Sequence, residues 1–204
     1  MAKTMSPSMH EMTDGQIDKA VDAYRTMLRK HRAELGSGSV QQVLTQPNYL
    51  GEQVGVLRRF VKAVSNIIIC CAKVNRSQKP QEAIKATGRV QYVSNDVVAS
   101  MPHGESEDVE VVFFNLGCFV SDNDLEKEYE LRGLKPVDPY SLAKVNEDDP
   151  AFADTKPNAT HWKDSNGKWC YAAFSQWHGS GRHVYVRRND NDWDDGWWFA
   201  GLRK

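Results

Sequence analysis

The side chains best suited to recognising another molecule are concentrated near the carboxyl end of the chain. Three polar stretches there, HGSGRH at 178–183, RRNDND at 187–192 and DDG at 194–196, are rich in His, Arg, Asn, Asp, Ser and Gly. Side chains of these types form adaptable hydrogen bonds, as on antibody-like surfaces, where tyrosine adds rigid aromatic contacts. Tyr185 lies between the first two stretches. We therefore expect this segment to bind a ligand through polar loops.

The acidic residues of this segment allow a calcium site as an alternative. Asp190, Asp192 and Asp194 occupy alternate positions, as in a calcium-binding loop. An EF-hand loop, however, has glycine where this chain has Asp195 and glutamate where it has Gly201. A calcium-dependent carbohydrate binder remains an alternative, but we expect a solvated acidic loop and no metal.

A hydrolase site would have to combine a histidine with a nucleophile. His161, His178 or His183 could act as a base toward Ser175 or Cys170. The sequence contains no nucleophile elbow, no metal-spaced pair of histidines and no glycine-rich phosphate loop. We expect the chain not to be an enzyme and to use no cofactor.

The composition changes sharply in the same part of the chain. All six tryptophans lie between Trp162 and Trp198. Residues 170–203 contain neither Lys nor Glu, whereas the first 168 residues hold 13 Lys and 11 Glu. Apart from Gln176 and the tryptophans, the polar and small loop residues belong to the set that an AAC codon reaches when only its adenines change. This composition indicates a fixed aromatic frame with substituted polar positions between its members.

Residues 161–204 resemble the variable region of the target proteins of diversity-generating retroelements, which carry a C-type-lectin-like domain at the C-terminus. In that family an error-prone reverse transcriptase changes adenines of a template copy, so exposed codons are replaced while scaffold codons stay fixed. The resemblance covers about residues 105–204. It rests on a frame of aromatic, Val, Arg and Gly residues: Trp169, Phe174, Trp177, Arg182, Val184, Val186, Trp193, Trp197, Trp198, Phe199 and Gly201.

The resemblance implies a binding protein that displays a hypervariable surface to a protein or cell-surface ligand. A protein-interaction module that is not diversified is the alternative. The residues expected to face the ligand are His178, Ser180, His183, Tyr185, Arg187, Asn189, Asp190, Asn191, Asp192, Asp194 and Asp195. The residues expected to form the scaffold are Trp169, Trp177, Trp193, Trp197, Trp198 and Phe199.

The elements that would position these residues form an α+β fold. The family's element order is one strand, two helices, and then several short strands with long loops, the last strand pairing back. Hydrophobic patterns and helix caps predict that order here. In one of the strands, Val184 and Val186 should be buried, while His183, Tyr185 and Arg187 point outward. The expected elements are a strand at 109–116, helices at 121–134 and 138–149, and strands at 169–174, 182–188 and 197–204.

The N-terminal part of the chain has a helical pattern. Thr13 and Gln16 fit a capping box for a helix that ends at Gly36, and a second pattern ends at Pro47. A third helix is predicted from about Leu50 to Val74, with Val54, Leu57, Val61, Val64, Ile68 and Cys71 as its buried stripe. The expected domains are a flexible tail at 1–12, a helical unit at 13–75, a connector at 76–107 with a short helix from Pro80, and a C-type-lectin-like domain at 108–204 whose variable region spans about 170–204.

The overall composition limits the remaining possibilities. With 26 Lys and Arg against 27 Asp and Glu, no global basic field favours nucleic acid as a partner. No apolar run is long enough for a membrane span or a signal peptide, which predicts a cytoplasmic protein, with display on a cell or phage surface as the alternative. The four cysteines lack metal-binding spacing and are predicted to be buried or half-buried thiols.

Overall fold

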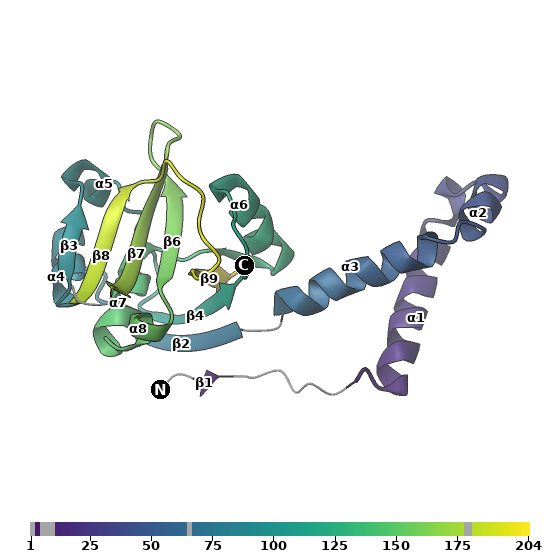
Figure 1. Ribbon diagram of the computed structural model, residues 1–204, viewed down its shortest axis with the longest axis horizontal. Coiled ribbons are helices and arrows are strands. Elements are labelled where there is room, and N and C mark those ends of the chain that lie inside the picture. Colours follow the sequence, from purple (N-terminus) through teal and green to yellow (C-terminus); the bar gives the residue numbers. More distant parts are fainter. Residues whose placement is uncertain (1–2, 5–10, 65–66, 178–180) are drawn as a thin grey trace. The chain divides into compact units, whose positions relative to one another are not determined.

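The computed structural model describes residues 3–4, 11–64, 67–177 and 181–204 (Figure 1). The chain divides into two compact units, Pro7–Lys62 and a larger unit of Met1–Ser6 with Ala63–Lys204. The first unit consists of helices, and the second combines a sheet with helices. The expectation of an α+β chain is therefore confirmed.

The helical unit begins where its capping signal predicts. The Thr13 side chain accepts a hydrogen bond from the Gln16 backbone, and the Gln16 side chain accepts one from the Thr13 backbone. The Tyr24 and Tyr49 hydroxyls, 2.5 Å apart, join the first and third helices. No described side chain of this unit is buried. Its elements are α1 (Asp14–Lys30), a 3-10 turn η1 (Arg32–Glu34), α2 (Ser37–Leu44) and α3 (Tyr49–Val64).

The third helix is shorter than its pattern predicts. It ends at Val64, and Ile67–Lys73 forms strand β2. The run of isoleucines at 67–69 suits a strand because β-branched side chains pack well on a pleated surface. The predicted buried stripe is wrong: Val54, Leu57 and Val61 are exposed, Cys71 is exposed on the strand, and Ile68 is buried within the sheet. The Val64 side chain lies outside the described part.

The larger unit is built on one sheet of nine described strands in the order β1-β2-β4-β9-β6-β7-β8-β3, with β5 pairing with β9 (Figure 1). The last strand, β9, pairs antiparallel with β4 and parallel with β6. The strands are β1 (Lys3–Thr4), β2, β3 (Val90–Val93), β4 (Asp108–Asn115), β5 (Leu134–Pro136), β6 (Asn158–Lys163), β7 (Trp169–Trp177), β8 (Gly181–Arg188) and β9 (Trp198–Arg203).

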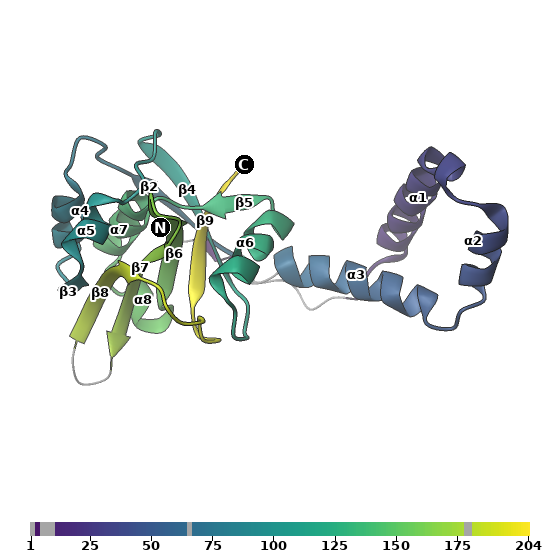
Figure 2. The ribbon, with the colours of Figure 1, turned by 90° about the horizontal axis from the view of Figure 1, so that it is seen from above.

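Two apolar layers cover the two faces of this sheet. On β4, Phe113 belongs to one layer and Phe114 to the other, because successive side chains point to opposite faces. Leu125 and Tyr129 of α6 complete the second layer, and the other helices complete the first (Figure 2). The helices are α4 (Pro80–Ala86), α5 (Asn95–Ala99), α6 (Asp122–Leu131), α7 (Pro139–Asp148) and α8 (Phe152–Thr155).

Residues 76–107 are a folded part of the larger unit and do not form a simple connector. Ile84 of α4 and Val97 of α5 are each 1% exposed in the first layer. Strand β3 lies between these helices in sequence and pairs parallel with β8, so Val90 is opposite His183. The expectation of a connector is wrong because a sequence pattern does not show which distant strand a four-residue segment will join.

The caps of α6 and α7 follow their sequence signals. The Ser121 and Asp138 side chains accept hydrogen bonds from the backbones of Asp124 and Ser141. Gly133 ends α6 with a φ of 64°, a conformation that glycine adopts without a Cβ clash. These local signals fix where α6 and α7 begin and where α6 ends.

The cysteines differ from their prediction. Cys70 and Cys170 are buried, but Cys71 and Cys118 are exposed. The prediction of four buried or half-buried thiols is therefore wrong for two of them.

The helices of the described residues also bear on membrane insertion. None of their helices is both long enough and apolar enough to cross a bilayer.

Candidate functional site

Strand β8 divides its side chains between the two faces of the sheet. Val184 and Val186 are fully buried in the first layer, as predicted. His183, Tyr185 and Arg187 lie on the other face, since they alternate with these valines. Arg187 is exposed and Tyr185 is half-buried, but His183 is only 3% exposed. The prediction that these three side chains lie on the face opposite the valines is thus confirmed. The prediction that His183 points outward is wrong in one respect, because the side chain is buried.

Strand β3 covers His183 and adds a tyrosine to the same face. The Tyr92 ring stacks on the Tyr185 ring with centroids 5.2 Å apart and meets the His183 ring edge-on at 5.5 Å. The Arg187 guanidinium carbon lies 5.7 Å from the Tyr92 centroid and 5.9 Å from that of Tyr185, and Arg187 Nε donates to the Tyr92 carbonyl. We call Tyr92, His183, Tyr185 and Arg187 the aromatic face.

Sequence reasoning missed Tyr92. Its signal is the alternation of Val90, Gln91 and Tyr92, which is typical of a strand but too short to reveal a partner. The parallel pairing of β3 with β8 places Tyr92 directly opposite Tyr185.

The loop at 189–197 contributes exposed acids held by one buried anchor. Asp190, Asn191, Asp192, Asp194 and Asp195 are all exposed, as expected of ligand-facing residues. Trp193 is 5% exposed and packs in the same apolar layer as Tyr185, so this loop docks on the face of the sheet that carries the aromatic face. The aromatic face and the docked loop therefore share one side of the larger unit.

Asp122, at the start of α6, holds this loop in place. Its Oδ1 accepts from Trp193 Nε1 at 2.9 Å and from His161 Nδ1 at 2.7 Å, and its Oδ2 accepts from Asn189 Nδ2 at 2.7 Å. Asn189 is half-buried by this contact, so its amide is turned toward the fold and not toward a ligand. Asp122 is only 7% exposed, and hydrogen bonds to a charged acceptor that is shielded from water are stronger than those at the surface.

The buried His161 links Asp122 to a second carboxylate. Its Nε2 lies 2.9 Å from Glu126 Oε1, and the Trp169 ring stacks on the imidazole with centroids 4.6 Å apart. Burial opposes the charged imidazole, but the Asp122 and Glu126 carboxylates beside the ring outweigh it and raise the pKa of His161 above its usual 6.5. The nearby imidazole in turn lowers the pKa of Glu126.

We expect the stability of the larger unit to fall as the pH rises from neutral into the alkaline range. A raised folded pKa means that the charged His161 contributes stability that is complete below about pH 6.5, its unfolded pKa, and is lost as pH rises through the folded pKa. Urea unfolding followed by tryptophan fluorescence measures this, because all six tryptophans belong to the larger unit. His161→Gln should reduce the decline of the unfolding free energy with rising pH, while the exposed control His103→Gln should leave that decline unchanged. An unchanged dependence of the unfolding free energy on pH in His161→Gln would contradict the raised pKa of His161.

The residues predicted as scaffold are not equally buried. Trp193 and Phe199 are buried, and Trp169, Trp197 and Trp198 are half-buried. Trp177 is 60% exposed near the end of β7, so the prediction of a buried scaffold role is wrong for it. Predicted ligand residues His178 and Ser180 lie outside the described residues.

We expect Trp177→Ser to change the free energy of unfolding by less than about 0.5 kcal/mol, because an exposed side chain loses little packing when it is replaced. Denaturant unfolding with intrinsic fluorescence measures the effect. A loss of several kcal/mol in the free energy of unfolding would contradict the exposed position of the Trp177 side chain.

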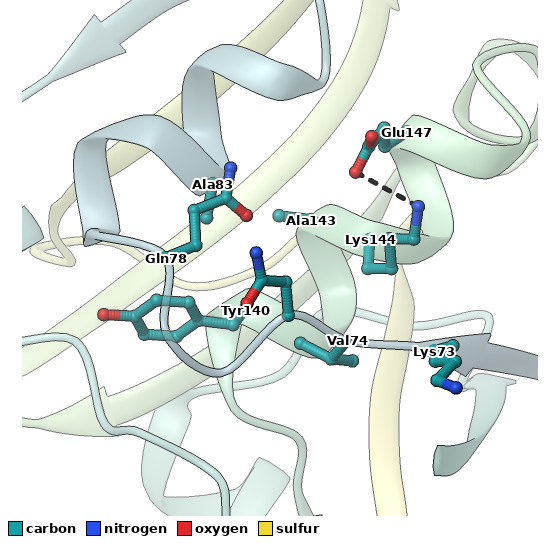
Figure 3. A pocket seen from close by; sticks show the side chains of 9 residues that line it. Lys73, Val74, Gln78, Ala83, Tyr140, Ala143, Lys144 and Glu147 are labelled. Carbon is teal, nitrogen blue, oxygen red and sulfur yellow. Dashed lines mark ion pairs between the residues drawn. The ribbon is translucent and has the colours of Figure 1, made fainter. Parts of the chain in front are cut away.

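Two cavities among the described residues are lined by none of the predicted ligand residues. One of about 220 Å³ lies between β2, α4 and α7, where Tyr140, Lys144 and Glu147 line it (Figure 3). Another of about 610 Å³ adjoins His161 and includes Lys135, Lys163 and Trp169. Small-molecule sites are usually concave, whereas protein interfaces are broad and rich in Tyr, Trp and Arg. The aromatic face and the loop have the second character.

The catalytic and metal alternatives gain no geometric support in the described part of the chain. Ser175 and His183 are direct partners across β7 and β8, yet neither Ser175 Oγ nor His183 Nδ1 has a hydrogen-bond partner. Cys170 is buried on the opposite face of β7. The described His, Cys, Asp and Glu side chains form no group of three or more that could hold a metal ion.

Most arginines of the C-terminal segment are paired with acids. Arg182 binds Asp154 in a bidentate contact, with Nε–Oδ1 and Nη2–Oδ2 distances of 2.9 and 2.6 Å. Arg188 Nη1 lies 2.7 Å from Asp96 Oδ2, with Asp164 also within reach. Such pairing cancels the positive field that phosphate binding requires.

Comparisons with known proteins give no relative. No family model, no curated protein and no solved structure matches this chain.

Proposed function

We propose that this chain is a binding protein that presents a diversified surface, made of the aromatic face and the loop at 189–197, to a protein partner. The observation that carries the proposal is the separation of buried and accessible residues within residues 181–199. Val184, Val186, Trp193 and Phe199 are buried, while the exposed positions between them carry residues within the set expected from adenine-directed change. Substitution at the exposed positions would thus leave the packed layers intact.

The arrangement of elements supports a C-type-lectin-like scaffold for this surface. The expected order of one strand, two helices, several strands and a final strand that pairs back corresponds to β4, α6, α7, β6 to β8, and β9. Strands β1, β2, β3 and β5 are additions to that order. β2 pairs with the outer side of β4 and carries β1, β3 pairs with the outer side of β8, and β5 pairs with β9.

A protein partner suits the chemistry of this surface. Stacked tyrosines supply large rigid contacts, Arg187 supplies a cation beside them, and the loop acids supply adaptable acceptors. Protein interfaces of standard size bury roughly 800 Å² on each partner, which requires a surface broader than a pocket.

Sequencing of the gene and its neighbourhood tests the diversification. We expect a nearby reverse transcriptase gene and a near-copy of the 3′ coding region that differs at adenines. Deep sequencing of the gene from a growing population should then find changes at the codons of Tyr185, Arg187 and Asp190–Asp195 except Trp193. Absence of the near-copy, with a uniform gene, would overturn diversification and leave a fixed interaction module.

A display library tests whether the surface tolerates change. We expect most variants randomised at Tyr185, Arg187, Asp190, Asp192 and Asp194 to keep the thermal midpoint of the parent within a few degrees, because surface substitutions cost little. The matched library randomises five buried positions, Val184, Val186, Trp193, Phe199 and Ala200, and should yield almost no folded members. Comparable folding in both libraries would contradict the proposed division.

A further inference from the structure

The described part of the helical unit has no core of its own. Its described residues, 11–61, include no buried side chain, although α1 and α3 are strongly amphipathic. A segment of about 50 residues needs a shared core to hold its helices, because isolated helices of this length are marginal in water. The apolar sides of α1 and α3 therefore need a partner.

The apolar residues of α3 follow a heptad repeat. Leu50, Val54, Leu57 and Val61 are separated by four, three and four residues, and they are 68%, 54%, 42% and 56% exposed. This alternation places valine at the a positions and leucine at the d positions of a coiled-coil seam. Among parallel coiled coils, a β-branched residue at a with leucine at d favours a pair of helices over three or four.

Helix α1 repeats the same spacing. Ile17, Val21, Tyr24 and Leu28 are again separated by four, three and four residues, and each is 42% to 48% exposed. Two copies of the chain would thus bring four such stripes together, two from α1 and two from α3. Four stripes are sufficient to enclose an apolar core of the four-helix type.

The exposed area is large enough for a stable dimer. The eight stripe residues of α1 and α3 are each 42% to 68% exposed, which gives each copy an apolar surface comparable with the roughly 800 Å² per partner of a standard interface. The largest apolar patch of a typical monomer is only about 300–600 Å².

We propose that the chain is a homodimer in which α3 packs in parallel against α3 of a second copy, with the apolar stripe of α1 joining the same core. An identical partner is favoured because the a and d pattern of α3 is self-complementary about a twofold axis. This dimer does not depend on the proposed ligand surface.

Light scattering after size-exclusion chromatography tests the dimer on the full chain. We expect a mass of twice 23.1 kDa for the parent and a loss of dimer in Leu57→Glu, which places a charge in the seam. Arg59→Glu is the matched control, because residue 59 lies on the opposite side of the same helix and is exposed. Tryptophan fluorescence, which reports the larger unit alone, should be unchanged in both variants. A monomeric parent, or a Leu57→Glu dimer, would overturn the proposal.

A cysteine at the seam tests the parallel arrangement. In a background where the exposed Cys71 and Cys118 are replaced by serine, Leu57→Cys should oxidise to a covalent dimer, since identical d positions meet across a parallel coiled coil. Arg59→Cys should run as a monomer on the same denaturing gel without reductant. A Leu57→Cys variant that forms no covalent dimer would exclude the parallel arrangement.

Discussion

Asp122→Ala should destabilise the larger unit by about 3–5 kcal/mol, because it removes the acceptor of a buried, partly charged cluster. Asn189 Nδ2, Trp193 Nε1 and His161 Nδ1 would all lose the carboxylate that accepts from them. Each unpaired buried donor keeps its desolvation cost without the hydrogen bond that offset it. The negative charge of Asp122 also lies in the first turn of α6, where it interacts favourably with the positive end of the helix dipole, and this stabilisation would be lost as well.

Urea unfolding monitored by tryptophan fluorescence measures this loss. The matched control is Asp190→Ala, which removes an exposed aspartate of the same loop and should change the free energy by less than about 0.5 kcal/mol. Equal effects of the two substitutions would show that Asp122 does not hold the loop. Hydrogen exchange at 189–197 should also accelerate in Asp122→Ala alone.

Trp193→Ala should cost about 3–5 kcal/mol and release the loop from the sheet. The indole meets Tyr171, Trp197 and Phe199 edge-on, with centroids 5.3 to 5.5 Å apart. Its backbone forms the bridge to Val120, so the loop is tied to the segment before α6 by main-chain hydrogen bonds as well. Removal of the ring would leave a cavity beneath residues that are otherwise exposed.

Trp193→Phe separates packing from hydrogen bonding. It keeps an aromatic ring but removes the Nε1 donor, so we expect a loss of about 1–3 kcal/mol. In the double variant with Asp122→Ala, the total should be smaller than the sum of the single losses, because both changes remove the same hydrogen bond. Additive losses would indicate that this hydrogen bond contributes nothing to stability.

Local sequence signals predicted the helices and strands whose causes are local. The Thr13, Ser121 and Asp138 caps each act within four residues, and alternation along β8 identified its buried valines. The helix-to-strand change near Val64 could not be predicted from periodicity, because it depends on pairing with β4, some 40 residues away. The boundary of the helical unit was misplaced for that reason.

The polar centre of the candidate site was missed for the same physical reason. In the sequence, Asp122 is one of several acidic residues at the start of a predicted helix, and no neighbouring residue indicates that it is buried. Its three partners lie 39, 67 and 71 residues further along the chain. Only the folded sheet, with α6 against its second layer, brings them together. The exposed acids of the loop needed no such assembly and were predicted directly.

The strict alternation along β8 has a consequence for the kind of genetic change that the strand accepts. Insertion or deletion of one residue would move Val184 and Val186 to the side of the sheet that carries the aromatic face, and would move Tyr185 and Arg187 into the first apolar layer. Replacement of single residues at fixed length leaves each side chain on its own face of the sheet. Strand β8 can therefore accept residue substitutions but not the insertion or deletion of one residue, so any process that diversifies it must conserve its length.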